Sequence, residues 1–143
     1  MKEVKRTTGT TYKATNLASG KSYKFIVMAV DGSNKVVSTS KVIHVYTKGG
    51  KSKKTSNPTA VKVKSTKVKL SLKSKKTKNF SLNGKVVSKG KMHRKIKYES
   101  SNPAIATVNA KGKITAKAAG KCKIFAYAAS GLCKTVNVTV KKK

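Results

Sequence analysis

The chain has 143 residues, and its 35 lysine and arginine side chains, against three acidic ones, give a formal net charge of +32. Hydrophobic residues make up 37%, which is enough for a core and argues against a fully disordered basic tail, and no apolar run approaches the ~20 residues of a membrane-spanning helix. The isolated acids Glu3, Asp31 and Glu99 provide neither the paired carboxylates of acid–base catalysis nor the oxygen cluster of a calcium site, so we expect no enzyme, no catalytic residues, no metal and no cofactor.

Residues 1–47 contain three runs rich in β-branched and aromatic residues, a composition typical of strands. The runs are Thr10–Leu17, Lys21–Asp31 and Lys35–Thr47, and the stretches ASG and DGSN separate them as turns. In the second run, apolar residues occupy both alternating sets of positions. This pattern predicts a strand that is covered on both sides.

Residues 48–57 read KGGKSKKTSN and combine two glycines with four lysines. Such a segment is flexible and is extended by repulsion between its own charges. We therefore predict a linker between a first unit, residues 1–47, and a second unit, residues 58–143.

In the second unit, short runs alternate apolar residues with lysine or serine, and no helical periodicity is sustained. The predicted strands are Ala60–Lys64, Lys67–Lys73, Asn79–Val87, Arg94–Ser100, Ile105–Val108 and Lys113–Ala116, followed by two strands between Cys122 and Val140. The pattern favours an all-β antiparallel sandwich in which each sheet has one buried face and one cationic face. The predicted core is Phe80, Tyr98, Ile105, Val108, Ile114, Ile124, Val136, Val138 and Val140.

Turn chemistry is concentrated around two places in this unit. Ser100, Ser101 and Asn102 can hydrogen-bond their own backbone and tighten a turn before Pro103. Gly112 and Gly120 suit bends that need a positive φ.

Several motifs recur here at fixed offsets, and together they resemble the bacterial Ig-like domain, group 2, over about residues 58–143. The matching motifs are Tyr98, Ser100-Ser101-Asn102, Ala106-Thr107-Val108, Lys111-Gly112, Ile114-Thr115-Ala116, Gly120 and Val138-Thr139-Val140. The family usually carries Trp where this chain has Tyr98, a conservative departure. The resemblance implies an Ig-like β-sandwich in a bacterial surface or secreted protein.

The stretch NLASGKSYKFIVMAV, with Leu17, Gly20 and Tyr23, is similar to the C-terminal part of a fibronectin type III domain, over about residues 8–47. The resemblance implies that Tyr23 is a corner tyrosine whose hydroxyl bonds nearby backbone. The first strands of that family are missing upstream of Thr10. Either the chain begins inside a larger protein, or these strands pack on the second unit or on another copy.

The two cysteines and two histidines carry no recognisable site. If the last hairpin turns around residues 129–132, Cys122 faces a residue near Thr139 rather than Cys133. The alternation of each strand also points the two cysteine side chains to opposite faces of the sheet. We therefore expect two free thiols. There is no CxxC spacing for zinc or redox chemistry. His44 and His93 lie in separate segments without a neighbouring acid, so we predict a strand-surface or loop position for each.

Lysine supplies nearly all of the positive charge, since Arg6 and Arg94 are the only arginines. Lysine is a hydrated point charge suited to diffuse attraction, whereas arginine forms bidentate contacts with phosphates and bases. The candidate polyanion-binding residues are Lys53, Lys54, Lys62, Lys64, Lys67, Lys69, Lys73, Lys75, Lys76, Lys141, Lys142 and Lys143. A solubilising coat remains the alternative interpretation of the same lysines.

The leading hypothesis is a non-enzymatic structural and adhesive module of a bacterial cell-surface or secreted protein, whose partners are anionic wall polymers or glycans and other domains of the same protein. No signal peptide is expected, because the first residues lack an apolar core. One alternative is an accessory module of a secreted hydrolase. The other is nucleic-acid binding, which we expect to be non-specific because arginines and stacking aromatics are scarce.

Overall fold

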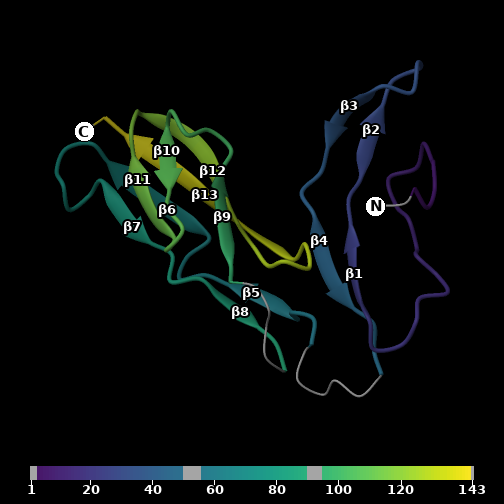
Figure 1. The fold of residues 1–143 in the computed structure, drawn as a ribbon. Coiled ribbons are helices and arrows are strands. Elements are labelled where there is room, and N and C mark those ends of the chain that lie inside the picture. Colours follow the sequence, from purple (N-terminus) through teal and green to yellow (C-terminus); the bar gives the residue numbers. More distant parts are fainter. Residues whose placement is uncertain (1–2, 50–55, 90–94, 143) are drawn as a thin grey trace.

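The computed structural model describes residues 3–49, 56–89 and 95–142, which form thirteen strands and no helix (Figure 1). In the first 49 residues the strands are β1 (Ser22–Phe25), β2 (Met28–Val30), β3 (Val36–Thr39) and β4 (Ile43–Tyr46). The remaining strands are β5 (Ala60–Lys62), β6 (Lys67–Ser71), β7 (Asn79–Ser81), β8 (Lys85–Val87), β9 (Lys97–Ser100), β10 (Ala106–Val108), β11 (Lys113–Ala116), β12 (Gly120–Tyr127) and β13 (Cys133–Lys141). No described segment is a helix that could cross a bilayer.

Two sheets form a sandwich, as the alternating runs predict. One has the order β6-β13-β12-β9 and the other β10-β11-β7, and the short β5–β8 ribbon extends the structure beside them (Figure 1). Most neighbouring strands are antiparallel, but β6 pairs with β13 in parallel. That pairing departs from the purely antiparallel arrangement expected from the sequence, because β6 and β13 are far apart in the chain and no turn forces them to be antiparallel.

The core lies between the two sheets and consists of the inward positions of alternating strands. The fully buried large side chains are Leu82, Ile114, Ile124, Val136 and Val138. Four predicted core residues, Phe80, Tyr98, Ile105 and Val108, are partly buried and pack against this cluster from its edge. The prediction of the core from alternation is therefore confirmed, with the edge residues less deeply buried than the central ones.

Tyr98 joins this core to a second, smaller cluster formed by Val61, Ala126 and Ala128. Its side chain packs directly against the backbone of Gly84 and Gly112. A Cβ atom added to either glycine would lie 2.1 or 2.7 Å from the Tyr98 side chain, so no larger residue fits there without a shift. Burial raises the pKa of the Tyr98 hydroxyl. Tyr98 thus packs against the core as predicted, but as a partly buried residue at its edge.

The serine-rich turn after β9 is held by its own side chains, as predicted. The Ser100 hydroxyl donates to the Ala106 carbonyl at 2.7 Å, and the Ser101 hydroxyl accepts from the Lys123 N–H at 2.8 Å. The Asn102 side chain accepts from the Ala104 N–H at 3.1 Å. This turn is a structural joint between β9, β10 and β12.

Some predicted strands are wrong in extent. Thr10–Leu17 contains no strand, and Asn79–Val87 is divided into β7 and β8. The division falls at Asn83, whose φ of 46° turns the chain out of extended geometry. Lys35–Thr47 likewise divides into β3 and β4.

The stretch Lys21–Asp31 is also two strands, and it is not covered on both sides. Val27 and Met28 are 72% and 48% exposed. Among the described residues β2 pairs only with β3 and β1 only with β4, and all three residues of β2 are exposed. An apolar pattern can specify a strand but cannot supply the sheet that would bury it.

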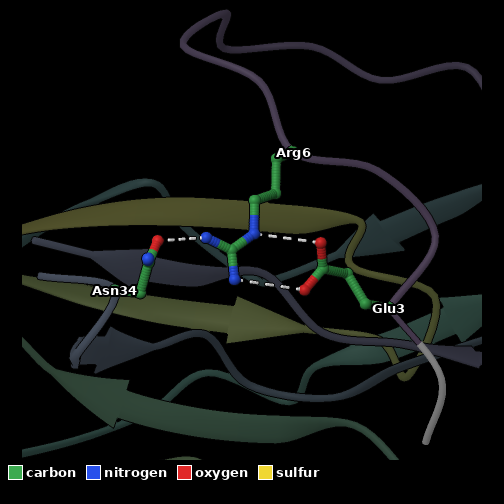
Figure 2. A network of polar contacts seen from close by, with 3 residues as sticks. All are labelled: Glu3, Arg6 and Asn34. Atoms are coloured by element: carbon green, nitrogen blue, oxygen red, sulfur yellow. Dashed lines mark hydrogen bonds and ion pairs between the residues drawn. The ribbon is translucent and has the colours of Figure 1, made fainter. Parts of the chain in front are cut away.

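Local hydrogen bonds order the first part of the chain. The Ala18 N–H donates to the Tyr23 hydroxyl oxygen at 2.8 Å, which is the backbone contact expected of this tyrosine. The Arg6 guanidinium donates to both carboxylate oxygens of Glu3 and to the Asn34 side chain, so it ties the N-terminal segment to the turn between β2 and β3 (Figure 2). The Arg6, Glu3 and Asn34 side chains are exposed, so we expect their contacts to contribute little to stability.

Candidate polyanion-binding face

The outward side of the sheet β6-β13-β12-β9 carries a compact group of lysines. In β6 the burial alternates so that Val68 and Leu70 face the core while Lys67 and Lys69 face solvent. The same alternation in β12 exposes its two lysines at positions 121 and 123. We call Lys67, Lys69, Lys121 and Lys123 the lysine quartet, and the outward side of this sheet the outer face.

Strand register brings the quartet together. Lys67 and Lys123 are both paired with Asn137, and Lys69 and Lys121 are both paired with Thr139, so β13 separates the two lysine pairs. Residues directly across a ladder point to the same side of a sheet. With strands ~4.8 Å apart and two residues spanning ~6.6 Å, the quartet occupies the corners of a rectangle of about 10 by 7 Å at the backbone.

None of the ion pairs found among the described residues includes a lysine of the quartet. All four side chains are exposed. The two ion pairs found among the described residues join Arg6 to Glu3 and Lys41 to Glu99. At physiological ionic strength the screening length is about 8 Å, similar to the spacing of these ammonium groups, so a polyanion lying on the face would meet several of them at once.

Other predicted lysines lie elsewhere on the second unit. Lys62 and Lys64 belong to the region of β5, and the Lys64 ammonium lies 5.8 Å from the centre of the Phe80 ring. Lys73, Lys75 and Lys76 lie in the connection between β6 and β7. Lys141 ends β13 and Lys142 follows it, both exposed. Lys53, Lys54 and Lys143 are outside the described residues.

The candidate residues chosen from the sequence therefore include only half of the quartet. Sequence reasoning misses Lys121 and Lys123, because nothing in the local sequence of β12 indicates that β6 lies on the other side of β13. The sequence does contain a pattern that indicates an outward position for both lysines. Lys121 and Lys123 alternate with Cys122 and Ile124, just as the lysines of β6 alternate with Val68 and Leu70. The partner strand across β13 was not visible from the sequence.

A groove adjoins the outer face where the first part of the chain meets the sandwich. The tip of the β12–β13 hairpin lies beside β4, and the His44 N–H donates to the Ala129 carbonyl at 2.8 Å (Figure 1). The groove has a cavity volume of about 690 Å³ and lies between residues 40–44 on one side and β9, β12 and the hairpin tip on the other.

Lys41 is the central polar residue of this groove. Its ammonium donates to the Glu99 carboxylate and, at 3.3 Å, to the Tyr127 hydroxyl, and it lies 5.3 Å from the centre of the Tyr127 ring. The hydrogen bond to Glu99, followed by the one to Tyr127, raises the pKa of Lys41. Lys41 therefore stays protonated and neutralises Glu99, the one carboxylate among the described residues that line the groove.

The histidines and cysteines do not assemble into a site within the described residues. His44 is a half-buried residue of β4, in agreement with a strand position, and His93 is outside the described part of the chain. Both cysteines are free, which confirms the expectation: Cys122 is buried opposite Val138, and Cys133 is exposed opposite Tyr127. No group of three or more His, Cys, Asp or Glu side chains in residues 3–49, 56–89 and 95–142 could hold a metal ion.

The two thiols should differ sharply in reactivity. Burial raises the pKa of both thiols, but only the Cys133 side chain is accessible to a reagent. Because the thiolate is the reacting species, labelling by a thiol-specific chromogenic disulfide should be faster at higher pH. We expect one equivalent to react rapidly in the native protein and the second only in denaturant. Cys133→Ser should abolish the fast phase, whereas two fast equivalents would contradict the burial of Cys122.

Residues 57–140 match the bacterial Ig-like domain (group 2), over more than half of the chain. The chain belongs to this family. The resemblance drawn from Tyr98 and the motifs that follow it is thus confirmed, and the family indicates a module of a bacterial cell-surface protein. The Ig-like match leaves out β1 to β4, so the fibronectin type III resemblance stays a prediction. No match to a curated protein was found.

Proposed function

We propose that this chain is a non-enzymatic structural and adhesive module that binds anionic polymers through the outer face of its Ig-like domain. The observation that carries the proposal is the register that places Lys67 and Lys69 beside Lys121 and Lys123. The family supports a surface location, where wall polymers and glycans supply dense negative charge. A net charge of +32 adds a long-range attraction that directs such polymers to the molecule.

The division of the chain is part of the same proposal. The second unit, residues 58–143, would hold the polymer, and residues 1–47 would be a fibronectin type III-like segment that connects it to other domains of the same protein. The Tyr23 hydroxyl accepts a hydrogen bond from the Ala18 N–H, as the corner tyrosine of such a segment would. The linker proposed at residues 48–57 falls mostly on residues 50–55, outside the described part of the chain.

The test is a salt titration of binding to linear polyphosphate, with four lysines changed at a time. One variant replaces the quartet with glutamine: Lys67→Gln, Lys69→Gln, Lys121→Gln and Lys123→Gln. The matched control has the same net charge but changes four exposed lysines of the first part of the chain: Lys13→Gln, Lys24→Gln, Lys35→Gln and Lys48→Gln.

We expect the logarithm of the binding constant to fall linearly with the logarithm of salt concentration, because binding releases counterions. Each lysine that neutralises a charge contributes about 0.7–0.9 to that slope, so the quartet variant should lose about 3 units of slope and the control much less. Equal effects of the two variants would contradict a localised face. Binding that is insensitive to salt, or absent, would contradict the charge-driven mechanism.

A further inference from the structure

The outward positions of β12 carry two lysines followed by two aromatic residues. They read Lys121, Lys123, Phe125 and Tyr127, while the inward positions face the core. Six residues of strand separate the first from the last, about 20 Å of backbone. The lysine quartet therefore continues directly into an aromatic pair on the same face, and a polymer that follows β12 would meet both.

The two aromatics form one wall of the groove beside the hairpin tip. Both residues are half-buried, so part of the groove wall that they form remains accessible. Cross-strand register places Thr135 and Glu99 on either side of Phe125, and Cys133 and Lys97 on either side of Tyr127. Aromatic surface with a few convergent polar groups, in a cavity of about 690 Å³, is the usual composition of a ligand site.

The charge of the groove favours an anionic ligand. Lys95 and Lys97 line it, and its single carboxylate, Glu99, is neutralised by the ammonium of Lys41. The same ammonium lies over the Tyr127 ring and fixes its position. An incoming carboxylate or sulfate group would thus meet uncompensated ammonium groups on both ends of the aromatic pair.

A ring sugar that carries a negative charge matches this combination. The C–H faces of a pyranose are weakly positive and apolar, and they complement the negative π-face of an aromatic ring. Its carboxylate or sulfate group would pair with lysine, and its hydroxyls can bond to Thr135 or Lys97. A polymer without rings, such as polyphosphate, can use only the lysines.

We propose that the outer face along β12 and the adjoining groove form a binding track for an acidic polysaccharide, with a sugar ring packed on Phe125 beside Tyr127 and acidic groups paired with Lys97, Lys121 and Lys123. This inference rests on the proposed function and narrows its ligand from polyanions in general to charged polymers of ring sugars. The lysines provide attraction that depends on salt, and the aromatics provide a contribution that salt does not screen.

The experiment measures the affinity of the full chain for three probes by calorimetry at about 0.15 M and 1 M sodium chloride. The probes are oligogalacturonate, a polymer of an acidic pyranose; polyphosphate, charged but without rings; and dextran, with rings but no charge. At 1 M salt the screening length is about 3 Å. We expect oligogalacturonate to retain measurable binding there while polyphosphate loses it, and dextran to bind at neither salt concentration.

The key variant is Phe125→Thr, which keeps a β-branched residue on the strand and leaves the Lys41–Tyr127 contact in place. We expect it to weaken oligogalacturonate binding on the order of tenfold at 1 M salt and to leave polyphosphate binding at low salt unchanged. Tyr12→Thr removes a tyrosine that is 52% exposed in the N-terminal segment and is the matched control, with no expected effect. Circular dichroism of each variant verifies that the sandwich is intact.

The outcomes separate the two proposals. If oligogalacturonate and polyphosphate lose binding in parallel with salt, or Phe125→Thr binds oligogalacturonate as the unmodified chain does, the aromatic track is wrong while the charge-driven function stands. Binding of dextran with the affinity of oligogalacturonate would overturn the requirement for an acidic sugar. If neither anionic probe binds at 0.15 M salt, the proposed function itself fails.

Discussion

Replacing Ile124 with alanine is expected to lower the free energy of unfolding by about 2–5 kcal/mol, the usual cost of truncating a buried isoleucine. Ile124 is completely buried at the centre of β12, paired with Val136 on one side and Ser100 on the other. A small domain is typically stable by only about 5–15 kcal/mol, so this single change would remove a large part of the total. Urea denaturation followed by circular dichroism measures the effect.

The neighbouring lysine provides the control. Lys123→Ala lies one residue away on the same strand but on the exposed face, so we expect a change in unfolding free energy within about 0.5 kcal/mol. The same variant should weaken polyanion binding, since it removes one member of the quartet. The pair of variants therefore separates stability from function on adjacent residues. A loss below 1 kcal/mol for Ile124→Ala would contradict the sandwich core described above.

Gly112→Ala should be about as damaging, for a different reason. Gly112 has a φ of 77°, and a left-handed backbone costs an alanine about 1–2 kcal/mol. In addition, the new Cβ would lie 2.7 Å from Cζ of Tyr98, and forcing apart a packed site costs about 1–3 kcal/mol. We expect an unfolding free energy lower by about 2–5 kcal/mol, measured in urea, with a changed near-ultraviolet signal from the displaced Tyr98 ring.

Two controls distinguish these causes from a general sensitivity to mutation. Lys111→Ala changes the exposed side chain next to Gly112 and leaves the Lys111 N–H free to donate to the Asn109 side chain at 3.0 Å. Gly32→Ala adds a methyl group where nothing lies within 4 Å. Both should stay within about 0.5 kcal/mol of the unmodified protein. A Gly112→Ala variant as stable as these controls would show that Tyr98 does not pack where the structure places it.

Local patterns in the sequence determine much of the Ig-like domain. Alternation between apolar residues and lysine predicts which side of β6 and β12 faces the core, because successive side chains of a strand point to opposite faces whatever its partner is. The Ser100 turn and the positive φ of Gly112 follow from the chemistry of those residue types alone. These features depend on a few consecutive residues, and the family resemblance rests on them.

The first 49 residues show the limit of the same reasoning. The apolar residues of β2 predict burial, yet Met28 and Val30 are 48% and 41% exposed, and within the described residues β2 pairs with β3 alone. Whether a strand is buried depends on the sheet that packs against it, and the sequence of the strand does not show whether such a sheet is present. The Lys41–Glu99 ion pair was equally invisible, since it joins residues 58 positions apart.

The sequence by itself determined the class of fold, the family, the inward residues and the lysine-rich outward positions of this protein. Only the tertiary structure decided that β6 lies parallel to β13, that Lys67 and Lys69 therefore share a face with Lys121 and Lys123, and that the hairpin tip meets β4 to form a groove. The physical reason is that side-chain alternation is set by covalent geometry within each strand, whereas register and docking result from contacts between segments far apart in the chain.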